Sequence, residues 1–104
     1  MQHVGIKTIS NRLLQTLLLA VILSASACET APPVQEMSDA RQAIAAAKEA
    51  GAAEKAAFHL KAAEDYLDSA EKALSDQEYS EARYDAKQAK MKALDALKAS
   101  EDSE

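Results

Sequence analysis

Hydrophobic residues recur at steps of three and four along most of the chain, which is the period of helices that bury one face. The pattern predicts a first helix over residues 38–50, with Ser38 as its cap and Gly51 as its stop. It predicts a second helix over residues 54–75 and a third over residues 77–99. No alternating run of β-branched residues competes with these helices, so the expected fold class is all-α.

The two longer helices carry complementary apolar seams. Residues 75–78 form a short polar break between them, with Asp76 as a candidate cap for the third helix. So short a connection requires an antiparallel hairpin, and alanine on one helix lets the other approach closely. The first helix is expected to fold back across this hairpin through Met37 and Ile44. The seam positions are Leu60, Ala63, Leu67, Ala70 and Leu74 on the second helix, and Tyr79, Ala82, Ala86, Ala89, Ala93 and Ala96 on the third.

A second apolar strip on the third helix does not fit a contact between two helices. We interpret it as packing against the first helix, with self-association or a partner as the alternative. An alanine seam also buries less apolar surface than a leucine seam, so the expected core is thin. The strip consists of Tyr84, Met91, Leu94 and Leu97.

Residues 1–27 follow a different pattern, that of a bacterial export signal. Lys7 and Arg12 precede the apolar run over residues 13–23, and small residues at 25–27 come directly before Cys28. The apolar run is shorter than the roughly 20 residues that span a bilayer. We therefore expect cleavage before Cys28.

This segment resembles the lipobox of bacterial lipoproteins, in which the cysteine sulfur receives a diacylglyceryl group and the new amino terminus is acylated. The resemblance implies a lipidated Cys28 at the start of a flexible tether over residues 28–37. Ala25 stands where leucine is usual, and residues 25–27 also suit ordinary signal peptidase. A free thiol or an intermolecular disulfide therefore stays open as an alternative, as does an uncleaved membrane anchor.

Lipidation would decide where the protein resides. Three acyl chains would hold it on a membrane almost permanently, since each buried methylene contributes about 0.8 kcal/mol. The residue after the cysteine is Glu29, whereas an aspartate at this position favours retention in the inner membrane. By resemblance to sorted lipoproteins, we expect the periplasmic face of the outer membrane, with the inner membrane as the alternative.

The charge of the chain narrows the classes of partner. The formal net charge is −5, and it becomes about −7 once Lys7 and Arg12 are removed with the signal. An acidic domain argues against nucleic acid and against adhesion of side chains to anionic lipid. Because Cys28 is the only cysteine, an internal disulfide is also excluded.

Candidate catalytic and metal-binding residues are few. His59 is the only histidine beyond the signal, and we interpret it as a surface or seam residue. Glu64, Asp65 and Asp68 lie close together on the second helix, where dense charge is typical of a solvated face and Asp68 can pair with Lys72. Metal binding by these carboxylates is the alternative. We expect no enzyme activity, no cofactor and no metal.

The tyrosines have a structural interpretation as well. We expect them to pack their rings and to keep their hydroxyls wet, with a ligand platform as the alternative. They are Tyr66, Tyr79 and Tyr84.

The helical part, expected to be a domain over residues 38–99 followed by an acidic tail over 100–104, resembles a known family. The family is an alanine-rich helical domain of unknown function in small Gram-negative periplasmic lipoproteins, also found ahead of OmpA-like domains. The resemblance implies no enzymatic activity. This chain lacks the Ala-Pro pair that often begins the second helix in the family, having Ala56-Ala57-Phe58 there. The matching stretches are residues 40–44, 50–52, 67–74 and 78–82, together with Leu60.

These observations predict a structural or adaptor lipoprotein of the cell envelope, with a periplasmic protein or the cell wall as its partner. One alternative is a murein-lipoprotein-like spacer, a continuous helix that joins peptidoglycan through a terminal lysine. Gly51, the break at residues 75–78 and the lysine-free residues 100–104 oppose it. Another alternative is a tetratricopeptide-like module that binds peptides, although one such unit cannot make a stacked array.

Overall fold

The computed structural model describes residues 11–17 and 31–103. Residues 11–17 are helical, and the other described helices belong to a separate compact unit that begins at Pro32. That unit contains α2 (Val34–Glu49), α3 (Ala52–Lys55), α4 (Ala57–Ser75) and α5 (Tyr79–Asp102). The described residues include no strand, which confirms the all-α class. None of the described helices is both long and apolar enough to cross a membrane.

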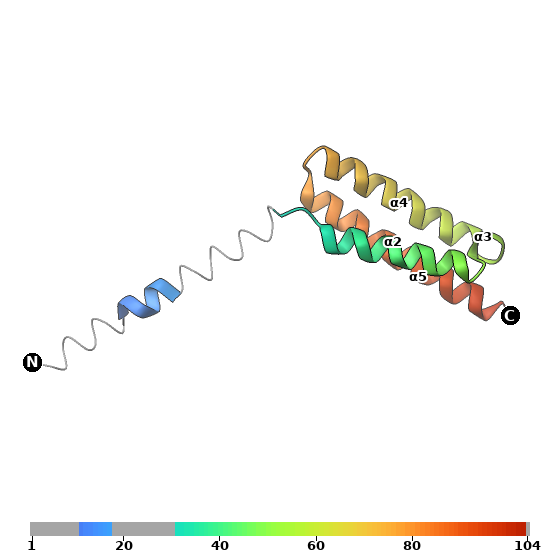
Figure 1. Ribbon diagram of the computed structural model, residues 1–104, viewed down its shortest axis with the longest axis horizontal. Coiled ribbons are helices and arrows are strands. Elements are labelled where there is room, and N and C mark those ends of the chain that lie inside the picture. The colour runs from blue at the N-terminus through green and yellow to red at the C-terminus, as the bar shows by residue number, and fades with distance from the viewer. Residues whose placement is uncertain (1–10, 18–30, 104) are drawn as a thin grey trace, which may run out of the picture. The chain divides into compact units, whose positions relative to one another are not determined.

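Helices α4 and α5 form the long hairpin that the sequence predicts, and α2 packs against both (Figure 1). The ion pairs of α2 give the directions of the three helices. Arg41 pairs with Glu71, whereas Lys48, about two turns further along α2, pairs with Glu64. The residue numbers of the partners therefore fall along α4 as they rise along α2, so these two helices are antiparallel. Because α4 and α5 form a hairpin, α2 runs parallel to α5.

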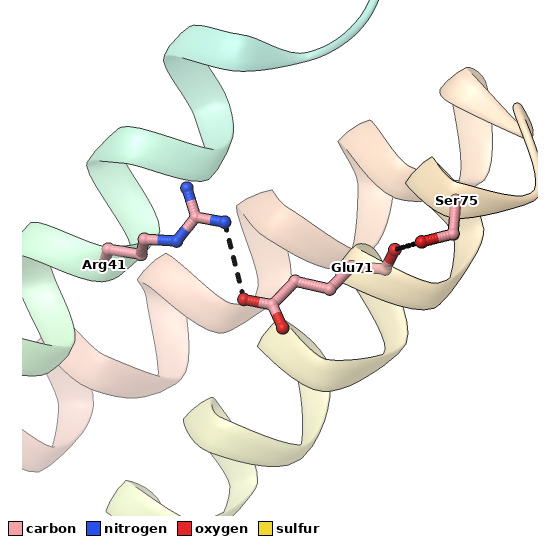
Figure 2. Close-up of polar contacts among 3 residues, drawn as sticks. All are labelled: Arg41, Glu71 and Ser75. Carbon is pink, nitrogen blue, oxygen red and sulfur yellow. Dashed lines mark hydrogen bonds and ion pairs between the residues drawn. The ribbon is translucent and has the colours of Figure 1, made fainter.

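Figure 2 shows one of these contacts in detail. The guanidinium of Arg41 reaches from α2 to the carboxylate of Glu71 on α4, with 3.4 Å between Nη2 and Oε1. One turn later, the hydroxyl of Ser75 donates to the backbone carbonyl of Glu71 at 3.1 Å. Both charged side chains are about half exposed, so the pair orients α2 but adds at most about 1 kcal/mol to stability.

Helix α2 begins four residues earlier than expected, and the prediction that Ser38 caps it is wrong. Pro33 holds the N-cap position, and its carbonyl accepts a hydrogen bond from the Met37 N–H at 3.0 Å. The earlier start places Met37 in the first turn, where its side chain is buried. Burial of that large apolar side chain explains why the helix takes in residues 34–37, which the sequence assigned to the tether.

The expected second helix is split in two. Gly51 ends α2 with a positive φ of 85°, as predicted, and α3 follows as a single turn. The chain then breaks again at Ala56, whose φ of −145° and ψ of 44° are not helical. Helix α4 then starts at Ala57.

The α4–α5 turn also differs from the expectation, because Asp76 does not cap α5. Asp76 is instead the C-cap of α4, and Gln77 adopts the left-handed conformation with φ of 62°. The N–H groups of Gln77 and Glu78 bond back to the carbonyls of Leu74 and Ala73, which is the Schellman pattern. Helix α5 then starts without a side-chain cap and continues to Asp102, beyond the predicted end at residue 99.

The core consists mainly of alanine, as the seam pattern predicts. One buried cluster joins α2, α3, α4 and the second half of α5, and a second joins the start of α2 to the middle of α4 and α5. Leu67 and Leu74 are only half-buried and pack on the edges of these clusters. The alanines of α5 that have no exposed surface are Ala82, Ala86, Ala89, Ala93 and Ala96.

Candidate functional site

Cys28, the residue to which the sequence assigns lipid attachment, lies outside the described residues, as does most of the expected signal. Within the expected signal, residues 11–17 form helical turns, and the Thr16 hydroxyl donates to the carbonyl of Arg12. The anchor thus stays a prediction from sequence. The sites that the structure does describe lie on the surfaces of α4 and α5.

The outer face of α5 carries three exposed apolar side chains, Tyr84, Met91 and Leu94, which we call the α5 stripe. Their exposed fractions are 61%, 57% and 45%. Spacings of seven and three residues place them on one side of the helix, opposite the alanine seam. The expected packing of this strip against the first helix is wrong for these three residues, and only Leu97 packs on the core.

The course of α2 accounts for this exposure. Ala43 and Ala47 of α2 and Ala93 and Ala96 of α5 share one buried cluster, so α2 lies against the alanine side of α5. Small side chains allow that close approach, which leaves the opposite side of α5 without a neighbour among α2, α3 and α4. Three large apolar groups consequently face solvent.

Lysines accompany the α5 stripe. Lys87 and Lys98 occupy the positions that complete its heptad spacing, and Lys90 lies beside it. All three are exposed, and in residues 31–103 none of them forms an ion pair, whereas Arg41 and Lys61 each pair with an acid. Sequence reasoning recognised the apolar strip but not these lysines, although their steps of seven and four from the apolar positions were visible in the sequence.

The carboxylates of α4 do not form a metal site in the described part of the chain. Asp65 pairs with Lys61 at 3.3 Å, and Glu64 pairs with Lys48 of α2 at 3.7 Å. The predicted pair of Asp68 with Lys72 is not formed among the described residues. These groups are exposed or half exposed, in agreement with a solvated face.

A second group of acids surrounds the hairpin turn. A hollow of about 400 Å³ there is lined by Ser69, Lys72, Asp76, Glu78 and Glu81, among others. A side-chain hydrogen bond with Glu78 and the charge of that residue raise the pKa of Glu81, with smaller contributions from burial and from other nearby acids. This corner of the domain concentrates negative charge at the turn between α4 and α5.

The aromatic residues and the histidine occupy surface positions. Tyr66 and Tyr79 are half-buried, in agreement with packing, while Tyr84 is exposed. His59 is half-buried and meets the ring of Phe58 edge-on, with 5.8 Å between the ring centres. Phe58 is itself 83% exposed, a position that the sequence pattern did not single out.

Comparison with known proteins gives one match. A family model described as "Domain of unknown function (DUF4398)" matches residues 35–104, which include all of α3, α4 and α5 and nearly all of α2. No curated protein and no solved structure matches the chain.

Proposed function

The chain belongs to the DUF4398 family, a domain of unknown function, and from this premise we propose that it is a lipid-anchored adaptor of the cell envelope. In this proposal, Cys28 carries the lipid and residues 28–33 act as the tether. Helices α2, α4 and α5, with the single turn of α3 between α2 and α4, form a three-helix bundle that recognises another envelope component. We place it on the periplasmic face of the outer membrane and assign it no catalytic activity.

The observation that carries the proposal is the position of Cys28. The only cysteine of the chain follows a basic segment, an apolar run and three small residues, which is where lipoprotein processing attaches lipid. A triacylated cysteine would bury enough methylene groups to make anchoring effectively permanent. The tether then sets the distance at which the helical domain meets its partners.

Two features of the described domain support an adaptor over an enzyme. Its histidine and the carboxylates of α4 lie exposed or half exposed on helix faces, without the closed and preorganised setting that acid–base catalysis requires. Three of the five large exposed apolar groups in residues 31–103 lie together on α5, and clustered exposed apolar surface is a mark of interaction sites.

The test is to replace Cys28 with serine and to follow both labelling and location. The unaltered chain should incorporate palmitate and fractionate with membranes, while Cys28→Ser should incorporate none and appear in the soluble periplasm. Thr30→Ser, a similarly small change two residues away, should behave as the unaltered chain. Retention of Cys28→Ser in membranes through detergent-free washing would refute the lipid anchor.

A further inference from the structure

The α5 stripe has the dimensions of a docking surface for one helix. Together with Lys87 and Lys98, its residues fall at steps of three and four from residue 84 to residue 98. At 1.5 Å per residue, this span is roughly 21 Å long, or about four helical turns. These steps are those of a seam into which a second helix packs its own side chains.

The charges around the stripe select among the possible occupants. A second copy of this chain would bring the same lysines towards the stripe, so unpaired positive charges would approach one another or face apolar groups. An anionic membrane would be repelled by the net charge of about −7 on the mature chain and by Asp95, which is exposed on the same side of α5. A helix that carries carboxylates can place them at the lysines and an uncharged residue opposite Asp95. It then pairs with the positive charges locally, whereas a membrane surface would also present its anionic groups to the acids of the domain.

We propose that the α5 stripe binds an amphipathic helix of a partner protein, with acidic residues flanking its apolar face. Apolar groups of that helix cover Tyr84, Met91 and Leu94, and its carboxylates pair with Lys87, Lys90 and Lys98. These lysines are exposed and have no ion partner in residues 31–103, so they are available to a ligand. The inference rests on the proposed adaptor role and names the chemistry of the partner.

Synthetic helices of opposite charge provide the test. The first probe is a peptide of three heptads with leucine at positions a and d and glutamate at e and g; the second has lysine at e and g. The full chain bearing Cys28→Ser is titrated into each labelled peptide, and binding is followed by fluorescence anisotropy. The glutamate peptide should bind, at least tenfold more tightly than the lysine peptide, and the difference should shrink at high salt.

Variants then locate the binding. Met91→Glu should weaken binding of the glutamate peptide at least tenfold, while the matched control Phe58→Glu, at another exposed apolar position, should leave it unchanged. Exchanging both Lys87 and Lys98 for glutamate should reverse the preference to the lysine peptide. Because these positions are exposed, each variant should keep the helical circular dichroism of the unaltered chain.

Several outcomes would overturn the inference. Equal binding of both peptides, or an unchanged affinity in Met91→Glu, would show that the stripe does not recognise an acidic helix. A dimer in sedimentation that Met91→Glu abolishes would assign the stripe to a second copy. Binding to phosphatidylglycerol vesicles that Met91→Glu abolishes would assign it to the membrane. Peptide binding is measured on a chain without lipid, so the two proposals are tested separately. If the glutamate peptide binds but the unaltered chain incorporates no palmitate, only the proposed lipid anchor is refuted.

Discussion

Replacing Ala86 with leucine should destabilise the domain, because this position has no space for a larger side chain. Ala86 has no exposed surface and shares a buried cluster with Ala70 of α4 and Met37 of α2. Leucine adds three carbon atoms at the point where all three helices meet. Overpacking of this kind costs about 1 to 3 kcal/mol.

The structure indicates which neighbour would yield. The Ala70 side chain has only its Cβ, so α4 could make room only by moving its backbone. Met37 is flexible and lies in the first turn of α2, so it can change rotamer more easily. In the double variant with Met37→Ala, leucine would fill the vacated volume. The two changes should therefore cost less together than the sum of the single changes, by about 0.5 to 3 kcal/mol.

Thermal unfolding followed by circular dichroism measures these effects. For a domain of this size, a loss of 1 kcal/mol lowers Tm by about 4 to 8 °C, so Ala86→Leu should show a clear decrease. Ala45→Leu is the matched control, since Ala45 is exposed in the middle of α2, and its effect should stay within about 0.5 kcal/mol. If Ala86→Leu and Ala45→Leu unfold at the same temperature, Ala86 lies outside any tight contact and the register of the hairpin is wrong.

Three further predictions concern the ends of helices. Gln77→Gly should raise stability by about 1 kcal/mol in chemical denaturation, because Gln77 holds a positive φ that glycine adopts freely; a loss of stability would contradict the Schellman turn. Ala57→Pro should be neutral or stabilising by up to about 1 kcal/mol, because proline is tolerated at the first position of a helix and Ala57 holds that position in α4. Ala63→Pro, in the interior of α4, should cost about 3 kcal/mol. Equal losses of stability in the two variants would argue against the helix break at Ala56. Carbon-13 titration should show that Glu81 deprotonates above its usual range, and Glu78→Gln should lower the pKa of Glu81. Because the folded state holds this proton more tightly than the unfolded state, ionised Glu81 lowers the stability of the fold. This loss of stability is complete above the folded pKa of Glu81 and disappears as the pH falls towards 4.5.

Periodicity predicted the seams of the hairpin well because alanine and leucine at steps of three and four leave little choice of buried face. Ala82, Ala86 and Ala89 are all fully buried, as expected. The pattern overstated the burial of Leu67 and Leu74, which are half-buried at the edges of the clusters. Small alanine seams bring the helices close together, so large side chains at the margin remain partly in solvent.

The ends of the helices could not be predicted from local signals. Ser38 and Asp76 both have side chains that can cap a helix. Burial of Met37 in the core extends α2 to residues before Ser38, and the Schellman turn makes Asp76 the C-cap of α4. The helix break at Ala56 could not be predicted, because no glycine or proline stands at this position or directly beside it. The exposed α5 stripe was misjudged because a single sequence does not show which side of α5 the first helix covers.

The central claim is that Cys28 carries lipid, and mass spectrometry of the amino-terminal peptide of the mature protein tests it most directly. We predict a peptide that begins at Cys28 and has the added mass of a diacylglyceryl group on sulfur and of one acyl chain on the amine. A peptide that begins at Cys28 with an unmodified thiol, or one that still contains residues 1–27, would contradict the account.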